Sequence, residues 1–342
     1  MQHTASAGAE VELGVFSLTD IVPGVSTPQR VRDIVDIGVF ADQAGLDLFG
    51  VGEHHTPRFA VASPAVVLAA VAARTASITL TSAVSVLSVL DPVRLHQDFA
   101  QLDLVSGGRA EITVGRSAYA EPFEIFGVDM ERYDDVFAEK LDLLRMIAHE
   151  DRITWEGRFR PPLNGVAVVP RLDRVLPVRL AVGGSPDSAR RAGRLGLPMT
   201  LAHLGGSTAR AQPAVDMYWQ AAETAGHPRA TLGIGVAAHL FVGATSQGAR
   251  ETFYPYYRAY FAQGRGVHLD RPTFEAMAGP AGALLVGSAQ EIAEKLVTQK
   301  ELFDANRFIG QVDLGGLPRS SVLGSIERFA SDVAPAVRTT SV

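Results

Sequence analysis

Strand-like and helix-like stretches alternate along almost the whole 342-residue chain, and this alternation constrains the fold more than any other feature. The strand-like stretches are residues 11–18, 48–52, 78–87, 110–114, 178–182, 199–202, 232–242 and 308–314. The helix-like stretches are residues 26–45, 64–75, 92–105, 133–150, 186–195, 209–225, 247–261, 288–303 and 320–333. Repeated strand–helix units at this spacing predict a single (β/α)8 barrel, a TIM barrel, with one strand from each unit.

Two insertions interrupt the predicted repeat. Residues 154–169, after the fourth helix, have the pattern of a short hairpin, and residues 265–280, after the seventh strand and its helix, are expected to be irregular. No linker marks a second domain, so we expect one domain over residues 1–342, with residues 1–10 as a loose N-terminal tail. A doubly wound open sheet is the main alternative, but Leu18-Thr-Asp-Ile21 stands where its glycine-rich turn should follow the first strand.

Composition excludes several classes of function. The formal net charge is −6 and there is no basic tract, which argues against binding to nucleic acid. The chain has no cysteine, so a disulfide, a thiolate nucleophile and a thiolate metal site are all excluded, and no metal site is expected. The first ten residues lack the features of a signal peptide, and the most apolar run, residues 60–73, is shorter than the roughly 20 residues of a membrane span. We therefore expect a cytoplasmic protein that does not enter the membrane.

The most informative segment follows the fourth strand and runs Val114-Gly-Arg-Ser-Ala-Tyr-Ala-Glu-Pro-Phe-Glu-Ile-Phe-Gly127. In (β/α)8 barrels, ligands bind where the strands end. The segment places Arg116 there, and a permanently charged guanidinium beside free backbone N–H groups is suited to holding a phosphate. A structural ion pair at the barrel rim is the alternative role for Arg116.

The fifth strand leads into a second segment suited to an anion, Ala181-Val-Gly-Gly-Ser-Pro-Asp-Ser-Ala189. Ser185 is placed to cap a helix whose first position is Pro186, and Ser188 falls in the first turn. A helix N-terminus with serine hydroxyls can bind an anion, although an ordinary capped helix explains the same pattern. Because the fourth and fifth strands are neighbours in a barrel, Arg116 and these serines are expected to converge on one phosphate.

The second and third strands supply the remaining candidates. His54 and His55 follow the second strand, but adjacent strand residues point to opposite faces, so the pair does not form a metal site by itself. One histidine at a strand end suits proton transfer near neutral pH, whereas two hydrogen-bonded rim histidines are the alternative. Ser82 and Ala83 are small enough for a flat ring to lie on the barrel mouth, or they are core residues. Aromatic residues in 253–261 and 274–277 indicate either a partly hydrophobic substrate pocket or packing between helices.

Taken together, these segments resemble the bacterial luciferase-like flavin monooxygenases over most of the chain. The resemblance rests on Glu53-His54-His55, Asp91-Pro-Val-Arg94, Leu102-Asp-Leu-Val-Ser-Gly-Gly-Arg109, the segment Val114 to Gly127, and Gly193-Arg-Leu-Gly-Leu-Pro-Met199. It implies a (β/α)8 barrel that binds reduced FMN delivered by a separate flavin reductase, acts with molecular oxygen on a small organic substrate, and forms a homodimer.

The resemblance also assigns roles to residues whose positions match. Arg116 and Ala118 would hold the flavin phosphate after the fourth strand, and Ser185, Ser188 and the Gly184 amide would hold it after the fifth. His54 would be the active-site histidine beside the reactive flavin carbon, serving the oxygen chemistry and not flavin binding. Ala83 and Val84 would form a non-proline cis peptide beneath the ring, which Phe16 and His203 would line.

Some positions depart from the luciferases. Gly115 stands where they carry a reactive-site cysteine, Gly184 replaces a glutamate and His203 replaces a tryptophan, so light emission is not expected. A deazaflavin-dependent hydride-transfer enzyme is the second interpretation, because such enzymes share the barrel and the phosphate strands. A flavin-binding protein without catalysis is the third.

Overall fold

Eight parallel strands form a closed barrel in the computed structural model, which describes residues 11–117 and 119–339, the side chains of residues 264 and 265 excepted. The strands are β1 (Glu12–Ser17), β2 (Leu48–Val51), β3 (Thr79–Ser82), β5 (Ala110–Gly115), β8 (Val178–Val182), β9 (Met199–Ala202), β10 (Ile234–Gly243) and β12 (Ala305–Gln311). They pair in chain order, and β12 pairs with β1 to close the ring, with Gly14 opposite Ile309. The predicted (β/α)8 barrel is confirmed, and the open sheet is excluded.

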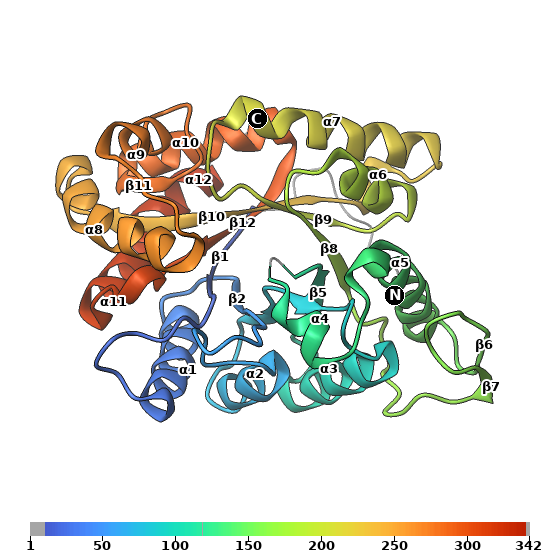
Figure 1. Ribbon diagram of the computed structural model, residues 1–342. Coiled ribbons are helices and arrows are strands. Elements are labelled where there is room, and N and C mark those ends of the chain that lie inside the picture. The colour runs from blue at the N-terminus through green and yellow to red at the C-terminus, as the bar shows by residue number, and fades with distance from the viewer. Residues whose placement is uncertain (1–10, 118, 340–342) are drawn as a thin grey trace.

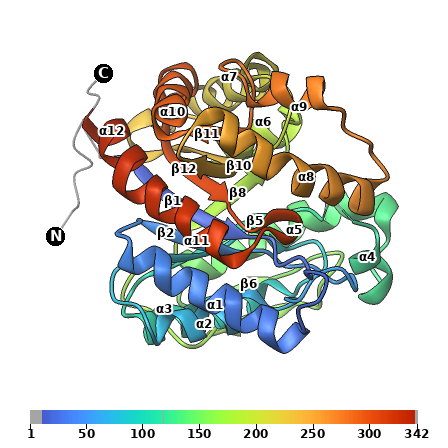
Figure 2. The same ribbon diagram turned by 90° about the vertical axis from the view of Figure 1, so that its left-hand side faces the viewer.

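Helices surround the barrel, as Figures 1 and 2 show. The principal helices are α1 (Thr27–Gln43), α2 (Pro64–Ala72), α3 (Pro92–Ser106), α5 (Tyr133–His149), α6 (Pro186–Arg194), α7 (Thr208–Thr224), α8 (Ser246–Arg265), α10 (Ala289–Phe303) and α11 (Arg319–Arg328). Local signals fix their ends. In α3, for example, the Asp91 side chain accepts hydrogen bonds from the N–H groups of Val93 and Arg94, and Gly107 ends the helix with a φ of 72°.

The third predicted strand is not continuous. It ends at Ser82, and the cis peptide bond between Ala83 and Val84 separates it from the two-residue strand β4 (Ser85–Val86). Strand β4 pairs with β5, with Ser85 opposite Val114. The cis bond stands at the position that the family resemblance implied.

The two expected insertions are present, but the second is more regular than predicted. After α5, strands β6 (Ile153–Trp155) and β7 (Leu163–Val166) form an antiparallel hairpin. After α8, the expected irregular segment is wrong: helix α9 (Arg271–Ala278) begins there, with the Asp270 side chain accepting a hydrogen bond from the Thr273 N–H. Strand β11 (Leu285–Ser288), which was not predicted, then pairs with β10. Two further helices were also not predicted: α4 (Glu121–Ile125), after β5, and α12 (Ala334–Thr339), beyond α11.

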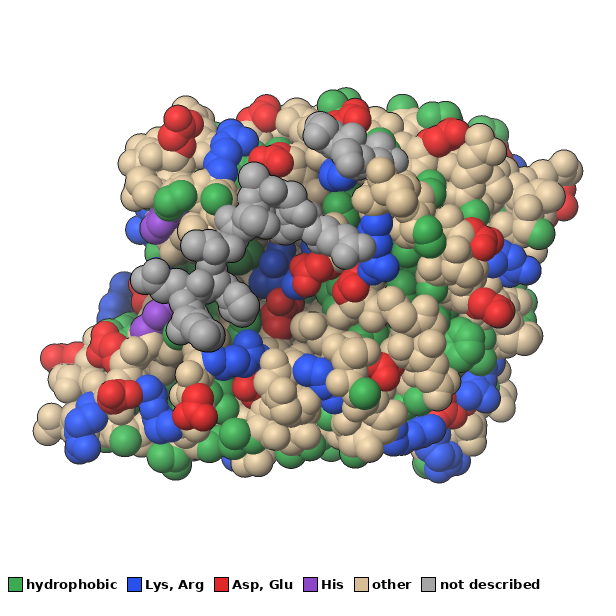
Figure 3. Space-filling view, turned by 180° about the vertical axis from the view of Figure 1, so that it is seen from behind, with side chains coloured by type: hydrophobic (Ala, Val, Ile, Leu, Met, Phe, Trp, Pro, Cys, Tyr) green, Lys and Arg blue, Asp and Glu red, His purple; other side chains and the backbone are tan. Residues whose placement is uncertain are grey.

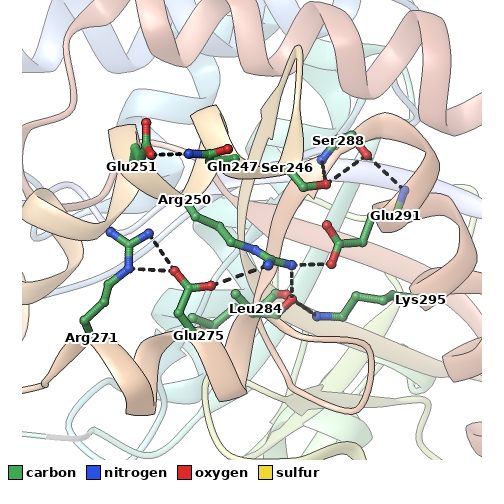
Figure 4. A network of polar contacts seen from close by, with 11 residues as sticks. Ser246, Gln247, Arg250, Glu251, Arg271, Glu275, Leu284, Ser288, Glu291 and Lys295 are labelled. Carbon is green, nitrogen blue, oxygen red and sulfur yellow. Dashed lines mark hydrogen bonds and ion pairs between the residues drawn. The ribbon is translucent and has the colours of Figure 1, made fainter.

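A network of polar contacts fastens the second insertion to the barrel wall (Figure 4). Arg250 of α8 is bonded to Glu291 of α10 and lies 3.4 Å from Glu275 Oε2 of α9. The Lys295 ammonium donates to the carbonyl oxygens of Leu284, at 2.5 Å, and Ala278, at 3.2 Å. Helices α8, α9 and α10 are therefore joined through side chains, which gives the insertion a fixed position.

Charged side chains fill the barrel at the end where the strands begin. The Arg307 guanidinium donates to Glu111 Oε1 at 2.6 Å and to Glu12 Oε2 at 2.8 Å, and Arg179 donates to the Met199 carbonyl oxygen at 3.1 Å. Burial alone would raise the pKa of Glu111, but the nearby Arg307 and Arg179 outweigh it and hold the pKa below its usual value. Acidic and basic side chains also gather around a hollow on the face shown in Figure 3. The barrel interior at the end where the strands begin is thus filled by ion-paired side chains.

Candidate functional site

Small side chains occupy the inner wall of the barrel toward the other end, where the strands finish. A Cβ atom built on Gly50 would lie 2.9 Å from Cβ of Phe16 and 3.0 Å from Cβ of Ala83. Phe16 and Ala83 belong to one apolar cluster inside the barrel, together with Leu18, Leu48, Ala237 and Ile309. The structure therefore brings Phe16 and Ala83 together on the inner wall, and Figure 2 shows this end of the barrel on the right, near α4. That a flavin ring lies against them stays a prediction.

Arg116 reaches the N-terminal end of α6, as the sequence predicted. Its Nη2 atom donates a hydrogen bond of 2.8 Å to Ser188 Oγ, which joins the ends of β5 and β8. The same guanidinium also forms an ion pair, with Asp134 at 2.6 Å, and donates to the Tyr133 hydroxyl at 2.9 Å. Arg116 therefore forms a structural ion pair and also reaches the helix end at which the phosphate site was predicted. The structure is compatible with both interpretations of this residue. Tyr133 and Asp134 at the start of α5 were not predicted.

The turn before α6 leaves space for a ligand. Gly184 has a φ of +86°, and a Cβ atom built on Gly183 or Gly184 would meet no atom of the described residues within 4 Å. Ser185 is the N-cap residue of α6, but its side chain makes no hydrogen bond to the helix N–H groups. These N–H groups and the hydroxyl can therefore hold an anion beside Arg116. Ala118, the other residue expected at the phosphate, lies outside the described residues.

His54 lies in an aromatic cluster just past β2. Its ring stacks on Phe59, with ring centroids 3.8 Å apart, and meets Tyr119 edge-on at 5.7 Å. Burial, with smaller effects from His55 and Arg58, lowers the pKa of His54 to about 3, so the imidazole is neutral at ordinary pH. Its Nδ1 atom is buried and has no hydrogen-bond partner among the described residues. Phe59 was not predicted, because its distance from the histidine depends on how the loop after β2 folds back.

His55 has a different role from His54. Its Nε2 atom lies 2.8 Å from Glu53 Oε1, and the other carboxylate oxygen of Glu53 accepts a hydrogen bond of 3.1 Å from the Val86 N–H. Glu53 is buried, so His55 provides a partner for a buried carboxylate that also binds the backbone of β4. Among the described residues, no group of three His, Cys, Asp or Glu side chains is arranged to hold a metal ion.

The side chain of His203 packs against an outer helix, while its backbone N–H donates to the carbonyl oxygen of Ala237 at 2.8 Å. Its ring is buried and packs edge-on against Phe303 of α10, with centroids 5.9 Å apart. Burial, and to a lesser extent the nearby charge of Lys295, lowers the pKa of His203 to about 4. A role of His203 in lining the flavin ring stays a prediction, because its ring contact is with Phe303 of the outer helix layer.

The aromatic residues of the second insertion are partly explained by packing. Phe253 and Phe274 are fully buried and face each other, with ring centroids 6.4 Å apart. This arrangement agrees with packing between α8 and α9. Tyr257, Tyr260 and Phe261 of α8 extend the same group toward His239 of β10.

Comparison with known proteins identifies the family. The family model described as luciferase-like monooxygenase matches residues 11–305, which is most of the chain. The chain belongs to the luciferase-like monooxygenase family.

Among curated relatives of this luciferase-like chain, the uncharacterized protein y4wF of Sinorhizobium fredii is 24% identical over 95% of this chain and 97% of its own length. The alkanal monooxygenase alpha chain of the Kryptophanaron alfredi symbiont is 25% identical over 64% of this chain and 61% of its own length. The F420-dependent glucose-6-phosphate dehydrogenase of Amycolatopsis mediterranei is 30% identical over 48% and 51%, respectively.

Solved structures share the fold. The monooxygenase RslO1 from Streptomyces bottropensis has a TM-score of 0.85 at 22% identity, over 95% of this chain and 99% of its own. The oxygenating constituent of 3,6-diketocamphane monooxygenase from Pseudomonas putida, in complex with FMN, has a TM-score of 0.77 at 19% identity, over 95% and 98%. An F420-dependent secondary alcohol dehydrogenase has a TM-score of 0.75 at 18% identity, over 96% and 99%. Within the described part of this luciferase-like chain, every helix is too short or too polar to cross a membrane.

Proposed function

We propose that this chain is the oxygenase of a two-component system, which binds reduced FMN from a separate reductase and uses molecular oxygen on a small, partly hydrophobic substrate. The observation that carries the proposal is the hydrogen bond from Arg116 to Ser188 at the N-terminal end of α6. It places a guanidinium, serine hydroxyls and free helix N–H groups around one space, which is the chemistry that a phosphate monoester requires.

The residues present fit FMN in charge. A Cβ atom at Gly183 or Gly184 would meet no atom of the described residues within 4 Å, so this turn leaves room for the phosphate, and Gly50 and Ala83 add no side chain larger than a methyl group to the inner wall. Bound reduced flavin would supply the electrons for oxygen activation. The Asp134 carboxylate pairs with Arg116 and so orients its guanidinium. Because Asp134 also lies beside the proposed phosphate, its negative charge repels the phosphate.

His54 supplies the proposed proton chemistry at the edge of this site. A neutral imidazole can accept a proton at one nitrogen and donate a hydrogen bond from the other. The Nδ1 atom of His54 is buried and has no partner among the described residues, so a ligand group that reaches it gains a hydrogen bond there. Phe59 and Tyr119 hold the ring and exclude water from it, which strengthens a hydrogen bond made there.

Hydride transfer with a deazaflavin is the second candidate function. Two observations favour it: a relative at 30% identity is an F420-dependent dehydrogenase, and a structure of the same fold is F420-dependent. Both cofactors carry a phosphate on a ribityl chain, so the site at Arg116 suits either.

One titration series distinguishes the candidates. The purified protein is titrated anaerobically with reduced FMN and with reduced F420, and absorbance spectra are then recorded after oxygen is added. The proposal expects tight, saturable binding of reduced FMN and a change in the rate of its reoxidation by oxygen. Binding of F420 alone would support the deazaflavin enzyme. Tight FMN binding with an unchanged reoxidation rate would support a flavin-binding protein without catalysis.

A further inference from the structure

Gln311 is a buried amide at the ligand end of the barrel that the proposed function does not use. We propose that its side chain binds a ligand edge on which a carbonyl oxygen and an N–H group lie side by side, as in an amide or imide. The inference rests on the proposed function in placing the ligand inside the barrel mouth. The pyrimidine ring of a flavin and an amide-bearing substrate are the two sources of such an edge.

The position of Gln311 follows from the strand register. It is the last residue of β12, and it lies opposite Phe16 of β1 and opposite His239 of β10. Side chains alternate along a strand, so Gln311 shares its face with Ile309, which belongs to the apolar cluster inside the barrel. The amide therefore lies on the inner wall, one layer nearer the strand ends than Ile309.

Burial makes the free amide costly. Gln311 is 0% exposed, and neither Oε1 nor Nε2 has a hydrogen-bond partner among the described residues. A buried polar group without a partner costs about 1–3 kcal/mol. An amide accepts at its oxygen and donates at its nitrogen, so a ligand that donates and accepts at adjacent atoms satisfies both.

The surroundings indicate a flat or aromatic ligand. His239 packs edge-on against Tyr257 and Phe261 of α8, with ring centroids 5.4 Å and 6.1 Å away. Phe16 lies on the strand at the other side of Gln311. The amide thus lies among apolar, aromatic and histidine side chains, and a few polar groups in a mostly apolar wall are the usual composition of a small-molecule site.

The chain provides a matched control. Gln299 is also buried, and both of its amide atoms also lack partners among the described residues. It lies on α10 in the outer helix layer, away from the mouth. Burial without a partner is therefore shared by the two glutamines, and only the position inside the barrel distinguishes Gln311.

The test replaces each amide by methionine, which keeps the length of the side chain. Gln311→Met and Gln299→Met are titrated with riboflavin, which lacks the phosphate, and with benzamide in the presence and absence of FMN. If the ligand edge belongs to the flavin, Gln311→Met weakens riboflavin binding at least about fivefold. If it belongs to a second molecule, riboflavin binding is unchanged and benzamide binding is lost. Gln299→Met changes neither.

The melting temperature separates this role from a structural one. Removal of an unsatisfied buried amide should leave the free protein at least as stable as the wild type, so Gln311→Met should lose binding without losing stability. Unchanged binding of both probes would overturn the inference, and so would a melting temperature well below that of the wild type in both Gln311→Met and Gln311→Leu. The leucine variant also supplies the binding test if the methionine variant does not fold. Failure of the wild type to bind FMN or riboflavin would count against the proposed function, and benzamide would then decide the role of Gln311.

Discussion

His54 illustrates how burial selects the chemistry of a single residue. Its pKa is lowered to about 3, so its protonated form is rare throughout pH 5–8 and the ring acts as a neutral donor or acceptor. We expect His54→Ala to keep near-normal FMN affinity and to lose about 10²–10⁴-fold in turnover, the usual contribution of acid–base assistance. Steady-state turnover and FMN titration measure the two effects separately.

His55→Ala is the control for His54. It removes the partner of the buried Glu53 and should lower the melting temperature, whereas His54→Ala should mainly lower the turnover rate.

The pH dependence of turnover provides a second check on His54. Because His54 is neutral above about pH 4, its contribution to turnover should not titrate between pH 5 and 8. An ionisation in that range that disappears in His54→Ala, or unchanged turnover of that variant, would contradict the role assigned to His54.

Residue positions were predictable only where local rules apply. The convergence of Arg116 and Ser188 followed from two strand ends that are neighbours in any barrel of this kind. Its partner Asp134 could not be predicted, because it lies 18 residues further on and its direction depends on where α5 begins. The orientation of His203 toward Phe303, and the burial of Gln311, depend on strand register, which composition does not specify.

At the scale of elements, the repeat was predictable and the exceptions to it were not. Alternating apolar runs indicated all eight barrel strands. Strand β11 was not predicted because it is only four residues long, and it pairs with β10 outside the ring. Helix α9 was mistaken for a loop because of its proline, although Pro272 stands in the first turn, where proline is well tolerated.

Helices α2 and α3 expose apolar side chains that one molecule alone does not cover. Val66 of α2 is 69% exposed, and Leu104 and Val105 of α3 are each 52% exposed. We expect these helices to form a homodimer interface, since apolar side chains exposed together favour association. Val66→Glu should therefore shift the protein from dimer toward monomer at micromolar concentration, as measured by light scattering with size-exclusion chromatography.

Leu302 provides the control for the dimer. It is 51% exposed on α10, so Leu302→Glu adds the same charge at a similar exposure on a different helix and should leave the dimer intact. A wild-type protein that is monomeric at micromolar concentration would refute the interface. Equal dissociation in both variants would place it elsewhere on the surface.

At the scale of the whole molecule, the two ends of the barrel differ in kind. The interior at the end where the strands begin is filled by the ion pairs of Arg307 with Glu111 and Glu12. The other end has small residues on its wall, with the Arg116–Ser188 contact at one side and Gln311 at another. The second end is the one at which ligands bind in (β/α)8 enzymes.

The central claim is that the flavin phosphate lies between Arg116 and the N-terminal end of α6. The most direct test compares the dissociation constants of FMN and riboflavin for the wild type and for Arg116→Ala. Loss of a charge-assisted hydrogen bond costs about 1.5–3 kcal/mol, so FMN should bind at least about tenfold more weakly to the variant while riboflavin binding changes little. Asp134→Asn, which removes the opposing carboxylate, should not weaken FMN binding. If Arg116→Ala weakens FMN and riboflavin equally, or neither, Arg116 does not hold the phosphate and the account is wrong.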